Sequence, residues 1–203
     1  MSTRQEAPTT AKRAAVQAAV LQATEELLAG GATFADLGIE RIATRAGISR
    51  TAFYFYFKDK RELLMRLTEE VQALLFEQAD IWFSGAGDPI EDLTEALRNI
   101  ALLYDEHAVL LRAIVEVATY DEEVAVFWRG TLGRFVDASE RRITVEHEHG
   151  RAACAHGRET AFALTWMTER TLYQQLVQSD PLPQRELVEA LAGIWARAVY
   201  GTS

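Results

Sequence analysis

Apolar side chains recur about every 3.6 residues along nearly the whole chain, which is the pattern of amphipathic helices. The first complete apolar face consists of Val16, Val20, Ala23 and Leu27. The most regular face lies near the C-terminus and consists of Leu187, Val188, Leu191, Ile194, Trp195, Ala198 and Val199. No alternating run is long enough to indicate a β-strand, and no internal repeat is present. The pattern therefore predicts an all-α protein.

Helix breakers divide this pattern into separate elements. Glycines at positions 30, 31 and 47 interrupt it, and the strongest break is the Ser-Gly-Ala-Gly-Asp-Pro run at residues 84–89. A further break, Ser-Asp-Pro-Leu-Pro, occupies residues 179–183. We expect about nine helices, over residues 10–29, 39–46, 49–57, 60–83, 90–104, 106–119, 121–148, 156–178 and 184–200.

Residues 37–64 have the features of a helix-turn-helix. Two short helices that cross closely need small residues at the crossing, and Ala43 and Ala46 provide them. Gly47 suits a turn that requires positive φ. Ser49 can cap the next helix by accepting a hydrogen bond from one of its free N–H groups.

The helix after the turn can bury one side and present the other to DNA. Phe53 and Phe57 are four residues apart and can anchor the buried face. Arg50 can donate two hydrogen bonds to a guanine, while Thr51 and Ala52 can contact thymine methyl groups. Neighbouring polar side chains lie where phosphates would pass. The candidate DNA-binding residues are Thr44, Arg45, Ser49, Arg50, Thr51, Ala52, Tyr54, Tyr56, Lys58 and Lys60.

Residues 53–57 also allow a different interpretation. Five consecutive aromatic residues could form a buried strand or ordinary core instead of a recognition helix. The charged residues that follow the run and the Gly-Ile-Ser-Arg segment that precedes it favour the helix. With that interpretation, we expect a DNA-binding domain over residues 1–60 and a second domain over residues 61–203.

Charge is distributed unevenly between these two parts. The formal net charge of −9 does not favour nucleic-acid binding by itself. Residues 1–65, however, carry nine Lys or Arg and seven Asp or Glu, a balance of +2, whereas residues 66–203 carry a balance of −11. A mildly basic head on an acidic body can direct positive charge at phosphates. The alternative is that the acidic residues only solvate helix faces.

A family resemblance rests on residues at fixed spacing in the N-terminal part. They resemble the TetR family of transcriptional regulators at Ile42-Ala43, Ala46-Gly47-Ile48-Ser49, Phe53-Tyr54, Tyr56-Phe57, Lys60 and Leu63-Leu64. The chain departs from the family at Gly38, where Thr or Ser is common, and at Tyr56, where His is usual. The resemblance implies a three-helix DNA-binding head, a helical body, and a homodimer that binds double-stranded DNA at palindromic operators.

Three further segments resemble the EthR-type branch of this family, namely residues 124–128, 164–173 and 194–201. That resemblance implies a hydrophobic tunnel with a few polar groups for an apolar small-molecule effector. Threonine stands at two positions where the branch commonly has asparagine, and a hydroxyl offers fewer hydrogen bonds than an amide. Some of these aromatic residues could instead be ordinary core. The candidate ligand-binding residues are Leu97, Tyr104, Trp128, Phe135, Thr165, Trp166, Thr168, Tyr173 and Trp195.

By the same resemblance, the last two helices form the homodimer interface. The apolar stripe that we assign to it consists of Leu172, Leu176, Leu187, Leu191 and Ile194. The stripe could also be buried within its own subunit, and both can hold on different faces.

The most consistent function is that of a repressor released from its operator by an apolar effector. An activator or global regulator of the same family, and an all-α carrier without DNA binding, are the alternatives. We find no catalytic or phosphate-binding motif, and we expect no enzyme activity, no cofactor and no metal. His147 and His149 are two apart and would point in different directions on a helix. The absence of a long apolar run and the single Cys154 predict a cytoplasmic protein without a membrane span.

Overall fold

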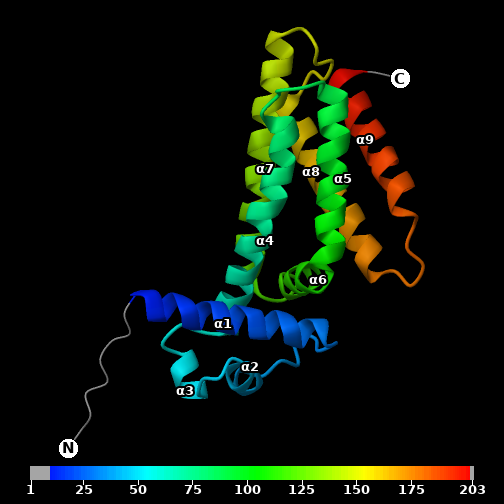
Figure 1. Ribbon diagram of the computed structural model, residues 1–203. Helices are drawn as coiled ribbons and strands as arrows, with labels where there is room; N and C mark the ends of the chain where they lie inside the picture. Colours follow the sequence, from blue (N-terminus) through cyan, green and yellow to red (C-terminus); the bar gives the residue numbers. More distant parts are fainter. Residues whose placement is uncertain (1–9, 202–203) are drawn as a thin grey trace, which may run out of the picture. The chain divides into compact units, whose positions relative to one another are not determined.

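The computed structural model describes residues 10–201, and within this range it contains nine α-helices and no strand (Figure 1). The all-α prediction is confirmed, and every expected helix is present. None of the described helices is both long and apolar enough to span a membrane. The helices are α1 (Thr10–Ala29), α2 (Ile39–Arg45), α3 (Arg50–Phe53), α4 (Lys60–Phe83), α5 (Pro89–Glu106), α6 (Ala108–Val117), α7 (Glu122–Glu148), α8 (Gly157–Val177) and α9 (Gln184–Tyr200).

The chain divides into two compact units, one up to Leu67 and one from Thr68 onward. We call the first unit the head and the second the body. The division falls inside α4, whereas the sequence pattern marks only the start of this helix, at residue 60. Leu63 and Leu64 near that start are completely buried, so the first part of α4 belongs to the packed core of the head.

The head is formed by α1, α2, α3 and the beginning of α4, and its core contains the residues expected from the sequence. Ile42 and Ala43 of α2 are buried, as are Phe53 and Phe57 beyond the turn. Gly47 has φ of 71°, a left-handed conformation that glycine adopts at little cost. This conformation lets the chain turn sharply between α2 and α3.

The third helix is shorter than the sequence pattern predicts. Residues 49–57 were expected to form one helix, but α3 ends at Phe53 and the chain continues in tight turns. The backbone N–H groups of Phe55 and Tyr56 donate to the carbonyls of Ala52 and Phe53, three residues back, at 3.0 and 2.9 Å. Helices commonly tighten in this way at their ends. The Phe57 N–H still donates to the Phe53 carbonyl at 3.0 Å, so the segment stays coiled and both phenyl rings are buried.

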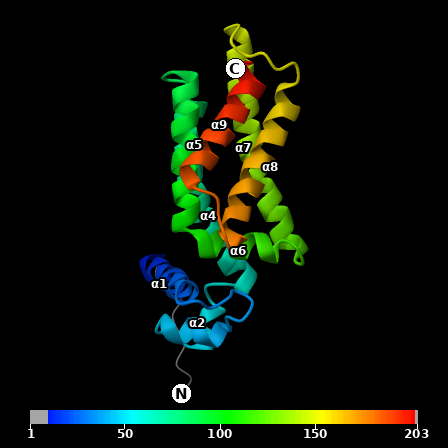
Figure 2. The same cartoon turned by 90° about the vertical axis from the view of Figure 1, so that its right-hand side faces the viewer.

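The body is a helical bundle in which α7 packs along α8 and α5 packs along α9 (Figure 2). The short helix α6 lies across one end of this bundle. Its side chains Leu111 and Ile114 are completely buried, and four further apolar side chains of α6 are buried with them. Asp88 caps α5 by accepting hydrogen bonds from the N–H groups of Ile90 and Glu91.

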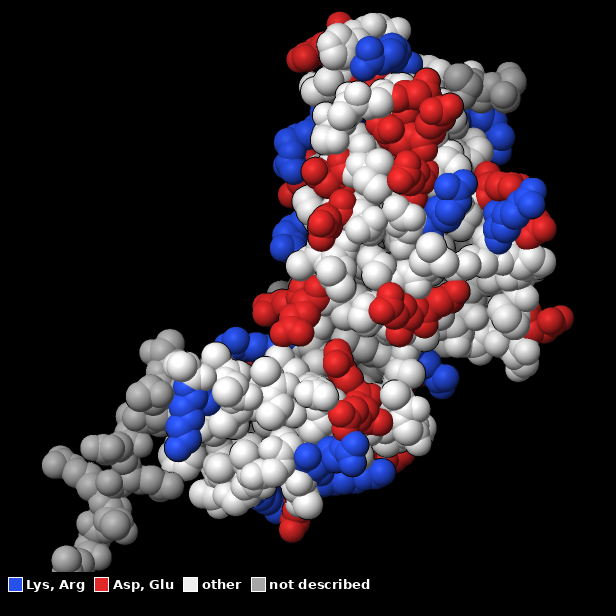
Figure 3. All heavy atoms as spheres, in the orientation of Figure 1, with Lys and Arg blue, Asp and Glu red and all other residues white. Residues whose placement is uncertain are grey.

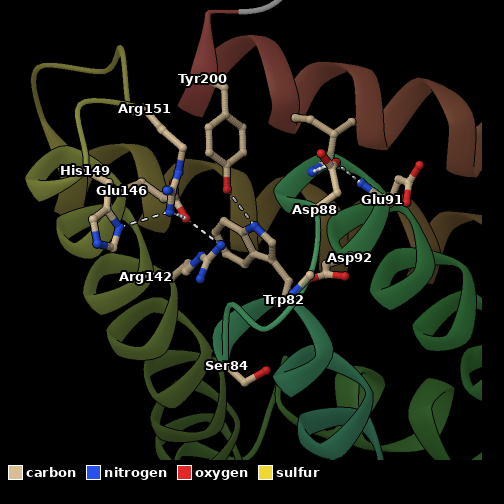
Figure 4. Close-up of polar contacts among 12 residues, drawn as sticks. Trp82, Ser84, Asp88, Glu91, Asp92, Arg142, Glu146, His149, Arg151 and Tyr200 are labelled. Carbon is tan, nitrogen blue, oxygen red and sulfur yellow. Dashed lines mark hydrogen bonds and ion pairs between the residues drawn. The ribbon is translucent and has the colours of Figure 1, made fainter.

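A buried charged cluster joins three distant segments of the body (Figure 4). The carboxylate of Glu146 is fully buried and pairs with Arg142 at 2.5 Å and with Arg151 at 2.5 Å. Next to this pair, the Trp82 indole donates a hydrogen bond to the Tyr200 hydroxyl at 2.9 Å. Gly85 packs directly against the guanidinium of Arg142. A Cβ atom at position 85 would lie 1.5 Å from Nη1 of Arg142, so a larger residue does not fit there.

Candidate nucleic-acid interface and ligand cavity

The exposed side of α3 is the candidate DNA-reading surface. Ser49 caps the helix as predicted, with its hydroxyl accepting a hydrogen bond from the Ala52 N–H at 3.1 Å. Phe53 and Phe57 stack at 5.4 Å between ring centroids beneath the helix and fix its orientation. Arg50 and Thr51 are exposed on the other side. The arrangement excludes the alternative in which residues 53–57 form a buried strand.

Two aromatic residues extend this surface. Tyr54 is 47% exposed and Phe55 is 62% exposed, and together with Arg50 and Thr51 they line a shallow hollow. Sequence reasoning included Tyr54 but missed Phe55. The spacing of the aromatic residues could have revealed it. Phe55 lies midway between Phe53 and Phe57, which share the buried face, so on a coiled segment its side chain points to the opposite side.

The other predicted DNA-binding residues are arranged around this surface. Thr44 and Lys58 are exposed. Arg45 donates from Nε to the Glu26 carboxylate at 2.7 Å, and this hydrogen bond is the main reason that the pKa of Glu26 is lowered. The ring of Tyr56 is half-buried beneath the guanidinium of Arg13, which lies 5.9 Å from the ring centroid. Basic side chains gather on part of the head in Figure 3.

Lys60 has a role inside the head that its sequence position does not reveal. Its ammonium group donates hydrogen bonds to the carbonyls of Phe34, Ala35 and Leu37 at 2.7, 3.1 and 3.1 Å. The same nitrogen lies 4.8 Å from the centroid of the Phe34 ring. Burial lowers the pKa of Lys60. An ammonium group has three donors, and all three are used here, so none is left to bind a DNA phosphate.

Replacing Lys60 by methionine should therefore lower stability without changing the phosphate contacts. The three carbonyls would lose their donor, and we expect a loss of about 1–2 kcal/mol in the free energy of unfolding. Urea denaturation of the full chain measures this loss. If the exposed side of α3 binds DNA, the salt dependence of that binding should keep the wild-type slope.

Lys58→Ala is the matched comparison, because Lys58 is exposed on the neighbouring turn. This substitution should leave the unfolding free energy unchanged but reduce the salt slope of DNA binding by about 1. The opposite outcome for the two lysines would contradict the roles given to them.

The body contains a narrow cavity that is lined from α4, α5, α7, α8 and α9. Its volume is about 80 Å³. Small-molecule pockets usually measure about 300–1,000 Å³, so a ligand of that size requires side chains of the cavity wall to move. The lining residues are Gln72, Leu75, Ala79, Trp82, Phe83, Leu93, Ala96, Leu97, Ile100, Tyr104, Trp128, Thr131, Leu132, Phe135, Ser139, Thr165, Thr168, Glu169, Leu172 and Trp195.

The structure brings most of the predicted ligand-binding residues together around this cavity, with two exceptions. Leu97, Tyr104, Trp128, Phe135, Thr165, Thr168 and Trp195 line it. Trp166 and Tyr173 do not. Both lie on an adjacent face of α8, where Trp166 packs against Phe162 and Tyr173 lies under the guanidinium of Arg170.

One of the two threonines has its hydroxyl already engaged. The Trp195 indole donates a hydrogen bond to Oγ1 of Thr168 at 2.9 Å, and both side chains are buried. The bond orients the Trp195 ring against the cavity. Trp195 also packs edge-on against Trp82 at 5.5 Å between centroids. In the free protein these contacts hold Trp195 in place on one side of the cavity.

Three polar groups in the cavity wall are buried without a hydrogen-bond partner among the described residues. They are Nε2 of Gln72, Nε1 of Trp128 and both carboxylate oxygens of Glu169. Buried polar groups in proteins are nearly always satisfied, so these unsatisfied groups need an explanation. Sequence reasoning missed Gln72 and Glu169, although both are strongly polar residues on otherwise apolar helix faces.

A separate apolar surface covers the outer sides of α8 and α9. On α8, Phe162 is 56% exposed, and Trp166, Tyr173 and Val177 follow it on the same side of the helix. On α9, Ile194 is 39% exposed. Within the predicted dimer stripe, Leu172 and Leu191 are buried in their own subunit, which is the alternative that the sequence left open. We call Phe162, Trp166, Tyr173, Val177, Leu187, Ala190 and Ile194 the outer face.

The histidines near the end of α7 do not form a recognisable metal site. Within residues 10–201, no three His, Cys, Asp or Glu side chains are grouped so that they could hold a metal ion. Cys154 lies 3.9 Å from Nε2 of His147, and His149 contacts Arg151 instead.

The fold and these two sites define a helix-turn-helix transcriptional regulator with a separate helical body. Residues 20–67 match the family of bacterial regulatory proteins of the tetR type, and residues 93–201 match the C-terminal domain of the transcriptional regulator EthR. The chain is 31% identical over 193 residues to the HTH-type transcriptional regulator EthR of Mycolicibacterium smegmatis, with 92% of this chain and 87% of that protein covered. The chain therefore belongs to the TetR family, in its EthR-like branch.

Solved structures share the fold at lower sequence identity. SmeT, the repressor of the Stenotrophomonas maltophilia multidrug efflux pump SmeDEF, matches with a TM-score of 0.72 and 19% identity, over 90% of this chain and 89% of SmeT. AibR, in complex with isovaleryl coenzyme A and operator DNA, matches with a TM-score of 0.65 and 18% identity, over 88% of this chain and 97% of AibR. At this level of identity the similarity concerns the fold alone.

Proposed function

We propose that this regulator is a repressor that leaves its operator when an apolar small molecule enters the cavity of the body. The observation that carries the proposal is the cavity itself. Its wall is mostly aromatic and aliphatic, and it contains buried polar groups that lack partners. A ligand with polar atoms in matching positions would satisfy them and gain affinity.

In the head, we propose that Arg50, Thr51, Tyr54 and Phe55 contact base edges in the major groove. They are the exposed residues of the helix that follows the turn. Thr44, Arg45, Tyr56 and Lys58, together with the backbone near Ser49 and Ala52, would contact phosphates. Binding to DNA implies that the protein acts in the cytoplasm, where a bacterial chromosome lies.

One helix contributes to both functions. Helix α4 begins in the head and supplies Gln72 and Trp82 to the cavity wall of the body. A ligand can change DNA binding only if it prefers an arrangement of α4 that does not match the operator. AibR, which was solved with both isovaleryl coenzyme A and operator DNA, provides a precedent for this fold with both partners.

We further propose that two copies pair through the outer face and bind a palindromic operator. A homodimer presents two recognition helices related by two-fold symmetry, which palindromic operators require. The outer face combines exposed apolar side chains from α8 and α9, the two helices that the family resemblance assigns to the interface.

Ile194→Glu and Phe162→Glu should each shift the protein from dimer to monomer. A charge at the centre of an apolar interface must be buried without a partner, so we expect dimerisation to weaken by about 100-fold or more. Light scattering after size exclusion measures the mass. Val126→Glu places the same charge on an exposed apolar position of α7 and should leave the dimer intact.

The operator and the effector can be identified in one selection. Duplexes retained by the full chain from a random pool, with and without small metabolites from a cell extract, should share a palindromic sequence that is released in the presence of the effector. Retention of no duplex at any salt concentration would contradict the proposal, since a carrier without DNA binding gives that result.

A further inference from the structure

Glu169 is the most unusual residue of the cavity. It lies on α8 and is only 3% exposed, and neither of its carboxylate oxygens forms a hydrogen bond of ordinary geometry within residues 10–201. The Trp128 indole is the nearby donor, close enough to oppose the rise in the pKa of Glu169. The nearest cation is Arg170, whose Nε lies 3.7 Å from Oε2, at the outer limit of an ion pair. The guanidinium of Arg170 is half-exposed and stacks on Tyr173, away from the cavity. A carboxyl group is thus directed to the cavity with most of its acceptor capacity unused.

In the free protein, burial of the charged form of this carboxyl group should lower the stability of the fold. Burial raises the pKa of Glu169, and the opposing effects of Arg170 and of the Trp128 indole do not offset it. A buried carboxylate needs hydrogen-bond donors or a positive charge close by. The cavity wall does not provide enough hydrogen-bond donors or positive charge for this carboxylate. A ligand in the cavity can provide them.

The groups around Glu169 favour a positive charge over a neutral donor. The rings of Tyr104, Trp128 and Trp195 line the same cavity, and the negative faces of aromatic rings attract cations. Tyr104 is close enough that the charge of Glu169 raises its pKa, after burial as the main cause, so this hydroxyl stays neutral. The rest of the wall is apolar, which suits the uncharged part of an amphipathic molecule.

The charge of the body acts in the same direction at longer range. Residues 66–203 carry twelve Lys or Arg and twenty-three Asp or Glu, a formal charge of −11. Figure 3 shows acidic side chains over the face of the body that it presents. Such a surface raises the local concentration of cations and lowers that of anions.

We infer that the effector is an apolar molecule with one protonated amine, and that its ammonium group binds the carboxylate of Glu169 between the aromatic rings of the cavity. This inference rests on the proposed function, in which the cavity is the effector site. It adds the chemical class of the effector and identifies the residue that selects it.

Three probes that differ only in their polar group test the inference: phenylbutylamine, phenylbutanol and phenylbutyrate. Binding to the full chain can be followed by tryptophan fluorescence, because Trp82, Trp128 and Trp195 line the cavity. We expect the amine to bind at least about 10-fold more tightly than the alcohol, because hydrogen bonds to a charged group are the stronger ones. The carboxylate should bind most weakly.

Glu169→Gln keeps the shape of the side chain and removes its charge. This variant should bind the amine about 10- to 100-fold more weakly and the alcohol as tightly as the wild type. Its melting temperature should be unchanged or higher, since an unpaired buried acid has been removed. Glu159→Gln makes the same change at an exposed position of α8 and should alter none of these values.

The possible outcomes separate the inference from the proposed function. Equal affinities for amine and alcohol, or amine binding that Glu169→Gln leaves intact, would overturn the inference while the cavity remains a ligand site. If none of the three probes changes the fluorescence, both the inference and the assignment of the cavity as effector site are wrong. Operator binding by the same protein preparations tests the DNA-binding function independently.

Discussion

Replacing Arg50 by glutamate should weaken operator binding by at least about 100-fold, because loss of a base contact costs about 1–3 kcal/mol and a carboxylate also repels the phosphates. Arg50 stands at the N-terminal end of the recognition helix with its side chain exposed. Its removal should not affect folding, because the helix is anchored from below by Phe53 and Phe57. Gel shifts with the selected duplex measure the affinity.

The milder substitution Arg50→Ala tests base reading separately from charge. It should lower affinity by about 10- to 100-fold and relax the preference at one base pair of each half-site. Arg185→Glu makes the same charge reversal as Arg50→Glu at an exposed residue of α9, and it should bind the duplex as the wild type does. Normal operator binding by Arg50→Glu would exclude this surface as the site of DNA recognition.

Replacing Glu146 by alanine should destabilise the body by about 3–5 kcal/mol, because it leaves a buried arginine without its partner. Arg142 is only 4% exposed, and its ion pair with Glu146 offsets the unfavourable burial of its charge. The same carboxylate binds Arg151, which lies in the segment after α7. The cluster also includes the tight turn at Gly85, which has φ of 69° and no room for a Cβ atom. Urea denaturation measures the loss.

The ion pairs of Glu146 with Arg142 and Arg151 also make the stability of the body depend on pH. Burial alone would raise the pKa of Glu146, but the hydrogen bond from Arg151 and the charges of Arg142 and Arg151 outweigh it and hold this pKa below its ordinary value. A carboxyl whose folded-state pKa is lowered contributes stability above its unfolded pKa and loses it as the pH falls through the folded value. The wild type should therefore lose stability in acid more steeply than Glu146→Ala.

Glu148→Ala is the matched control for this substitution. Glu148 lies two residues further along α7 with its side chain exposed, so its replacement should change stability by less than about 0.5 kcal/mol. An equal loss for the two variants would show that helix α7 is sensitive to any change near its end. The buried pair would then have no special role.

The positions of the helices could be predicted from the sequence because their signals are local. The start of α4 at Lys60 and its end at Phe83 agree with the pattern of apolar residues and with the break after it. The cap at Ser49 and the positive φ of Gly47 follow from properties of single residues. The extent of α3 could not be predicted, because the burial of Phe53 and Phe57 is compatible with both a full helix and a tightened turn.

The sequence by itself determined an all-α chain and favoured a helix-turn-helix in it, since residue spacing distinguishes the buried face of a helix from its exposed face. The structure excluded the buried strand that residues 53–57 also allowed. The sequence could not determine which neighbour each buried side chain meets. Only the tertiary structure shows that Glu169 lines the cavity whereas Trp166 and Tyr173 do not. It also shows that the ammonium group of Lys60 donates hydrogen bonds to three carbonyls of the head. Helices in a bundle have neighbours on several sides, and the choice among them depends on residues far apart in the chain.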